Sequence, residues 1–125
     1  MKKRVSEICN VLYGEGNVSC EPSNAEIAEA VRNKEFELRG FQHDLGTLQT
    51  EWQRAAQNNS DEFCRLVRMY HARRIAFFIV NGWSEPIVLR GDGCTIEDGL
   101  HRLKAALYKG IPEVEITVLS SATIA

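Results

Sequence analysis

The stretch that decides the fold is residues 94–118, which read CTIEDGLHRLKAALYKGIPEVEITV. Its central part predicts a helix that opens at Asp98 as the N-cap, carries Leu107 on its inward face and ends at Gly110. Residues 114–118 then alternate apolar and polar side chains, which is typical of a half-exposed strand. A helix enclosed by short strands indicates an α+β architecture.

The rest of the chain continues this pattern, with helices first and strands later. Ser23 and Glu26 have the spacing of a capping box and predict a helix that starts there. By periodicity and turn residues, helices are expected over residues 4–13, 23–34, 44–57 and 60–80, and short strands over 87–89 and 94–97. A strand over residues 76–80 is the rival to the end of the last helix, since six apolar residues in a row fit either structure.

Length and composition are those of one ordinary globular domain. The chain has 125 residues, of which 44% are hydrophobic and 26% are charged. We expect residues 1–125 to form a single domain, with residues 1–59 as a helical extension and residues 60–119 as a mixed unit. The net charge of -2 argues against a protein that coats nucleic acid by bulk charge.

The sequence also indicates where the protein resides. No apolar run is long enough for a membrane span, and the basic start is not followed by a secretory signal, so we expect a cytoplasmic protein without membrane partners. The four cysteines are widely scattered and lack the spacing of a zinc site. They are expected to be free, mostly buried thiols.

The beginning of the helix after residue 97 carries the chemistry. Gly99 allows a close turn, while His101 and Arg102 place cations in the first turn, where the helix dipole is already positive. Exposed N–H groups at the same end would complete a site for an anion such as phosphate. The alternative is that Arg102 reaches solvent and pairs with Glu97 or another surface acid, and the spacing leaves both interpretations open.

Residues 98–106, DGLHRLKAA, together with Gly110 and the strand over 114–118, resemble the central motif of the ParB/sulfiredoxin superfamily. The segment from Arg74 to residue 89 resembles the helix and the Pro-Ile-x-Val strand that precede this motif. The likeness covers about residues 70 to 119. It implies a small mixed sheet, with a helix whose start faces phosphate, beneath a helical N-terminal half.

The resemblance also implies a function. In relatives the His-Arg pair contacts phosphates, so His101 and Arg102 are expected to bind a nucleotide, with Gly99 permitting close approach and Arg74 one helix away. Asp98 would position a metal or a phosphoryl acceptor and so belongs with them as a catalytic candidate. ATP or CTP with Mg²⁺ are the implied cofactors, in a phage- or plasmid-borne member of the family.

Two departures from the family narrow the activities that the resemblance implies. Leu100 stands where sulfiredoxin has its catalytic Cys, and a leucine supplies no thiolate, so peroxiredoxin repair is excluded. Partition proteins carry a DNA-reading domain after this unit, and the few residues left after the last strand are not expected to form one. NTP hydrolysis and phosphoryl transfer stay open.

Two further features have competing interpretations. Asp92, between two glycines, is a candidate Mg²⁺ ligand, although Gly-Asp-Gly is also an ordinary turn. Four arginines, at positions 65, 68, 73 and 74, make one helix basic and suggest weak contact with nucleic acid. The rival functional hypothesis is a non-catalytic interaction protein that binds DNA or another protein through the same scaffold, because only one phosphate-binding element is recognisable and no general base stands out.

Overall fold

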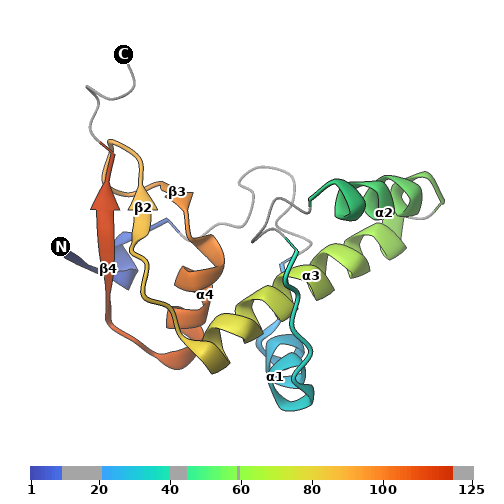
Figure 1. Cartoon of the computed structure of the whole chain (residues 1–125), viewed down its shortest axis with the longest axis horizontal. Coiled ribbons are helices and arrows are strands. Elements are labelled where there is room, and N and C mark those ends of the chain that lie inside the picture. Colours follow the sequence, from blue (N-terminus) through green and yellow to red (C-terminus); the bar gives the residue numbers. More distant parts are fainter. Residues whose placement is uncertain (10–20, 40–44, 59, 120–125) are drawn as a thin grey trace. The chain divides into compact units, whose positions relative to one another are not determined.

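The computed structural model describes residues 1–9, 21–39, 45–58 and 60–119, and its fold is α+β, as the sequence predicts. The chain divides into two compact units. Figure 1 shows its helices and strands, coloured by residue number. The sheet unit comprises Met1–Leu12 and Phe78–Ala125, and the helical unit comprises Tyr13–Phe77. In the part of the chain that the structure describes, none of the helices combines the length and the apolar character that a membrane crossing needs.

A mixed sheet forms the centre of the sheet unit. Its strands, β1 (Lys2–Arg4), β2 (Ile87–Leu89), β3 (Ile96–Asp98) and β4 (Glu113–Val118), lie in the order β1-β4-β2-β3. β2 and β4 are parallel, and the outer strands β1 and β3 are each antiparallel to their neighbour. The parallel pair requires a crossover connection, which the helix between β3 and β4 supplies.

Helix α4 (Leu100–Lys109) covers one face of this sheet (Figure 1). The alternation in β4 directs Val114 and Ile116 into the core and leaves Glu113 and Glu115 exposed, as the sequence predicts. Leu103 of α4 is fully buried in the same core. The other members of this core are Val5, Ile8, Ile87, Leu89 and Ala106. α4 ends at Gly110 in the left-handed conformation, which confirms the predicted stop.

The N-terminal segment differs from its prediction. The helix expected over residues 4–13 is wrong in its described part, because Lys2–Arg4 form β1 and Val5–Glu7 form a single 3-10 turn, η1. Val5 and Ile8 are buried nonetheless. A spacing of three residues brings two side chains to the same side of a 3-10 turn as well as of an α-helix. Residues 10–13 lie outside the described part of the chain.

Helices make up the helical unit: α1 (Asn24–Asn33), α2 (Leu45–Asn58) and the residues of α3 (Ser60–Asn81) up to Phe77. The prediction of these helices is confirmed, and the rival strand over residues 76–80 is wrong. Ser23 caps α1 with the expected capping box, in which its Oγ accepts from the Glu26 N–H at 3.1 Å. The Glu26 carboxylate in turn accepts from the Ser23 N–H at 3.0 Å.

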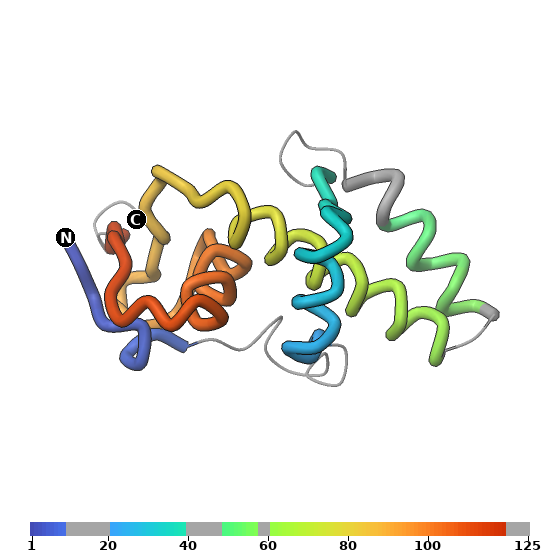
Figure 2. The backbone as a smooth tube through the Cα atoms, turned by 90° about the horizontal axis from the view of Figure 1, so that it is seen from below, coloured from blue at the N-terminus to red at the C-terminus, as the bar shows by residue number. Residues whose placement is uncertain are grey.

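Aromatic contacts hold α2 and α3 beside each other, and Figure 2 shows the two helices running side by side. The Trp52 ring meets Tyr70 edge to face at 5.3 Å between ring centroids, and it meets Phe63 at 6.4 Å. Cys64 of α3 forms a disulfide, so the expectation of a free thiol is wrong for this residue. Cys20 lies outside the described residues. Cys9 and Cys94 are free thiols, as expected, but the expected burial is wrong, because Cys9 is exposed and Cys94 is half-buried.

The capping box gives a prediction about stability. Ser23→Ala removes the acceptor for the Glu26 N–H and should lower the free energy of unfolding by about 1 kcal/mol in urea denaturation. Ser23→Asp is the matched control, because its carboxylate can accept the same hydrogen bond, and it should stay close to wild type. An unchanged Ser23→Ala variant would show that the cap contributes nothing to the stability of α1.

Candidate functional site

The motif DGLHR forms the corner between β3 and α4. Asp98 is the last residue of β3, and Gly99, with φ of 106°, is the N-cap of α4 without any side-chain cap. The predicted cap at Asp98 is therefore wrong by one residue. The reason is that the chain needs a positive φ at the corner, which glycine adopts without strain and an aspartate does not.

The side chain of Arg102 points inward from this corner and leaves the residue only 7% exposed. Its Nη1 donates to the carbonyl oxygens of Glu85 and Pro86, both at 3.0 Å. Its Nη2 donates to Asp98 Oδ2 at 3.3 Å, and this carboxylate lies at the surface with 74% of the side chain exposed. The guanidinium thus joins the chain before β2 to the start of α4, a structural role that neither sequence interpretation of Arg102 included.

Gly99 leaves space for this guanidinium. A Cβ built on Gly99 would lie 2.9 Å from Nη2 of Arg102, which is too close for any real contact. The family resemblance implied that this glycine permits the close approach of a phosphate. In the structure the group that approaches it is the arginine of the motif itself.

The structure brings Asp98, Gly99 and Arg102 into contact, and His101 lies half-buried beside them in the first turn of α4. Arg74, in contrast, belongs to the helical unit. Its Nη1 donates to the Arg39 carbonyl at 3.0 Å, and its guanidinium lies 5.9 Å from the centre of the Tyr70 ring. Arg74 therefore holds the connector after α1 against α3 in that unit.

The other arginines of α3 also have partners inside the helical unit. Arg68 pairs with Glu26 of α1 at 3.3 Å, and Arg73 pairs with Glu35 at 2.7 Å. Arg65 pairs with Glu62, one turn earlier on the same helix. The sequence suggested that these arginines contact nucleic acid. In the structure their charges are compensated by carboxylates of the chain itself, so they do not form a row of uncompensated cations on α3.

Asp92 organises the turn between β2 and β3. Its Oδ1 accepts from the backbone N–H groups of Cys94 and Thr95, both at 2.8 Å, and its Oδ2 accepts from the Thr95 hydroxyl. The hydrogen bond from the Thr95 hydroxyl, followed by those from the two N–H groups, lowers the pKa of Asp92 to about 2. The turn also moves the start of β3 to Ile96, two residues later than predicted.

These residues do not fit the implied magnesium ion. The carboxylate of Asp92 already accepts three hydrogen bonds. Across residues 1–9, 21–39, 45–58 and 60–119, no three His, Cys, Asp or Glu residues lie close enough to hold a metal together. Of the two interpretations of Gly-Asp-Gly, the structure therefore shows the turn.

A groove of about 450 Å³ opens elsewhere in the sheet unit, between η1 and the corner from α4 to β4. Leu107, which the sequence placed in the core, is 40% exposed and lines this groove. Its other lining residues are Arg4, Val5, Ser6, Gly110, Ile111, Pro112 and Glu113. Sequence reasoning missed the groove, although an apolar pattern that continues to the very end of α4 was a signal for it.

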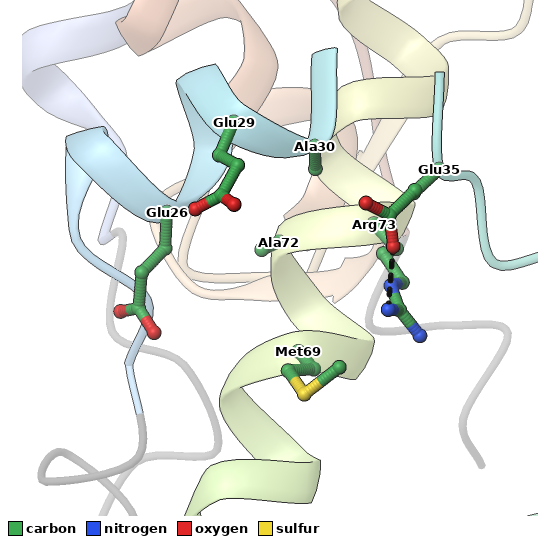
Figure 3. A pocket seen from close by; sticks show the side chains of 7 residues that line it. All are labelled: Glu26, Glu29, Ala30, Glu35, Met69, Ala72 and Arg73. Atoms are coloured by element: carbon green, nitrogen blue, oxygen red, sulfur yellow. Dashed lines mark hydrogen bonds and ion pairs between the residues drawn. The ribbon is translucent and has the colours of Figure 1, made fainter. Parts of the chain in front are cut away.

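The helical unit has a cavity of about 310 Å³ between α1 and α3, drawn in Figure 3. Ala30, Met69 and Ala72 form its apolar part, and the Glu26 and Glu29 carboxylates lie on one side of it. Arg73 reaches Glu35 at the other side. Because Glu26 and Glu35 pair with arginines of the chain itself, most of the acidic charge of this cavity is already compensated.

The contacts of Arg102 predict a large loss of stability when the guanidinium is removed. Arg102→Met keeps an apolar stem but leaves two carbonyls without donors, and it should lower the free energy of unfolding by about 3 kcal/mol. Arg90→Met is the matched control, because Arg90 forms an exposed ion pair with Glu97 at 2.9 Å. It should cost less than about 1 kcal/mol. Equal losses in the two variants would contradict the structural role of Arg102.

The turn at Asp92 predicts a pH dependence. Its folded-state pKa lies below the value of about 4 in an unfolded chain, so its contribution to stability is complete above that pH. This contribution is lost as the pH falls from about 4 towards about 2. Asp92→Asn should therefore be less stable than wild type at pH 6, and the gap should narrow between pH 4 and pH 2.5 in urea titrations. Glu113→Gln, at an exposed position, is the control, and a gap of constant size would contradict the prediction for Asp92.

Comparison of the chain with protein-family models, with curated proteins and with solved structures found no match.

Proposed function

We propose that this chain is a non-catalytic interaction protein, and that its sheet unit binds an apolar segment of another protein. The observation that carries the proposal is the groove beside α4, where a side chain expected in the core is instead exposed. Leu107 is 40% exposed and lines the groove together with Ile111. Large apolar side chains gathered at a concave surface are typical of sites that receive a partner's side chains.

The walls of the groove suit a peptide segment with an apolar anchor. Its apolar lining comes from Val5 of η1, from Leu107 of α4 and from Ile111 just after that helix. Arg4 and Glu113 also line it, and as register partners in the β1–β4 pair they lie beside each other, so a cation and a carboxylate are offered at one place in the groove. The partner that fits is an exposed segment with one or two apolar side chains and charged residues close to them.

The contacts of the motif argue for binding rather than catalysis. Arg102 donates to two backbone carbonyls and to Asp98, and so presents no free fork to a phosphate. The carboxylate of Asp92 already accepts three hydrogen bonds within its own turn. With these groups committed to the fold, the residues expected to perform phosphoryl transfer are not arranged for it.

Phosphate binding stays as a second candidate, on one specific observation. The N-terminus of α4 has no side-chain cap, and the guanidinium of Arg102 lies next to Gly99 at that end. An anion such as the phosphate of ATP or CTP would be attracted there, with His101 in the first turn as a ligand. The ParB/sulfiredoxin-like assignment belongs to this second candidate, and the order β2, β3, Gly99, α4, β4 supports it.

The proposal predicts which substitution abolishes binding of an apolar peptide. Peptides selected from a displayed library on the full chain should bind wild type and lose at least about tenfold in affinity with Leu107→Asp, measured by fluorescence polarisation. Lys109→Asp is the matched control, since it makes the same helix more acidic outside the groove, and it should leave the affinity within about twofold. Recovery of no peptide, or of peptides that Leu107→Asp does not weaken, would overturn the proposal.

A thermal-shift series with ATP and CTP, each with and without Mg²⁺, separates the two candidates. The interaction protein should show no shift. A rise in Tm that depends on nucleotide concentration and disappears in His101→Ala would favour the second candidate. His101 is the residue to change, because a variant of Arg102 would alter stability by itself.

A further inference from the structure

Two free thiols meet in the sheet unit, although they are 85 positions apart in the sequence. The Sγ atoms of Cys9 and Cys94 lie 2.8 Å apart, and the Cys9 N–H donates to the Cys94 carbonyl at 3.1 Å. Cys9 is exposed and Cys94 is half-buried. We propose that Cys9 and Cys94 form a redox-active pair that closes to a disulfide, a modification site independent of the groove and of the motif.

The fold holds both cysteines in place before any bond forms. Cys94 lies in the turn that Asp92 organises, and its N–H donates to Asp92 Oδ1 at 2.8 Å. Cys9 follows Ile8, which is anchored in the core with 5% exposure. A disulfide needs its sulfur atoms at about 2.05 Å. A movement of less than about 1 Å therefore brings the two thiols to bonding distance.

The reaction needs an oxidant, and a small disulfide such as glutathione disulfide is the class that fits. The thiolate of Cys9, the more exposed of the two, attacks one sulfur of the small disulfide. This breaks the S–S bond and releases one thiol, leaving a mixed disulfide on Cys9. Cys94 then attacks the Cys9 sulfur and releases the second thiol. The two protein thiols are oxidised, the small disulfide is reduced to two thiols, and these take up the two protons.

The surroundings of Cys9 slow the first step of this reaction, the attack of its thiolate on the small disulfide. The hydrogen bond with Cys94, followed by desolvation and by the nearby charges of Cys94 and Asp92, raises the pKa of the Cys9 thiol. Since the thiolate is the nucleophile, attack at neutral pH is slow. The proximity of Cys94 nevertheless favours the second step over the persistence of a mixed disulfide, because it is an intramolecular reaction.

The bond would close a long loop. Everything between the two cysteines, including the helical unit, lies in that loop, so the cross-link would remove much conformational freedom from the unfolded chain. It would also fasten the segment after η1 to the turn between β2 and β3. Oxidation is therefore expected to stabilise the sheet unit and to depend on the thiol–disulfide balance around the protein.

Peptide mapping tests the proposal directly. The full chain is incubated with glutathione disulfide, free thiols are blocked, and the protein is cut after Lys, Arg and Glu. These cuts place the four cysteines on separate peptides, with Cys9 in residues 8–15 and Cys94 in residues 91–97. The expected product is a species joining these two peptides, with a mass lower by two hydrogens than the sum of the reduced peptides.

The melting temperature gives a second measurement on the same samples. Oxidation should raise Tm by several degrees in wild type, and Cys9→Ser and Cys94→Ser should each abolish both the linked peptide and the rise. Glutathione retained on Cys9, two unmodified thiols, or a link to a different cysteine would each overturn the proposal. If a serine variant does not fold, the peptide map of the wild-type chain still decides.

Discussion

The guanidinium of Arg102 donates to the carbonyl oxygens of Glu85 and Pro86, and the rest of the sheet unit is built around this contact. A buried guanidinium costs free energy unless its N–H groups find acceptors, and here two carbonyls at the approach to β2 supply them. Gly99 leaves the space that the guanidinium fills, and Asp98 compensates its charge at the surface. The start of α4 and the approach to β2 are thereby fixed to each other.

This contact also bears on the phosphate site that the sequence predicts at the start of α4. A cation in the first turn of a helix is unfavourable unless it gains something in return. Either a bound anion or a set of backbone hydrogen-bond acceptors can offset this cost. The same sequence in the first turn suits both, so the sequence does not distinguish them. Arg102 uses the backbone acceptors. Exposed Leu107, at the opposite end of α4, then becomes the more informative residue for function.

The charges of the helical unit show the same principle. Arg68 and Arg73 have carboxylate partners on α1 and on the connector after it, so their charges are compensated within the unit. Ion pairs between exposed groups contribute little each. Their effect here is mainly on specificity, because they define which faces of α1 and α3 meet. A count of basic residues along one helix therefore overstates its affinity for nucleic acid.

The sequence by itself determined the features that depend on near neighbours. The capping box of Ser23 and Glu26, the stop of α4 at Gly110 and the alternation of β4 involve side chains at most four residues apart, and all were predicted. The start of α4 was predicted one residue early, because the positive φ at Gly99 follows from the corner and not from capping preference.

Only the tertiary structure decided the features that join distant segments. β1 pairs with β4 near the other end of the chain, so a local pattern that suits a helix was overruled by hydrogen bonding to that strand. Arg102 finds its acceptors 16 and 17 positions earlier, and Cys9 meets Cys94 across 85 positions. Helix pitch and capping preferences determine the contacts between residues that are a few positions apart. The partner of a long side chain depends on which segments the packed core brings together, and no local spacing encodes that.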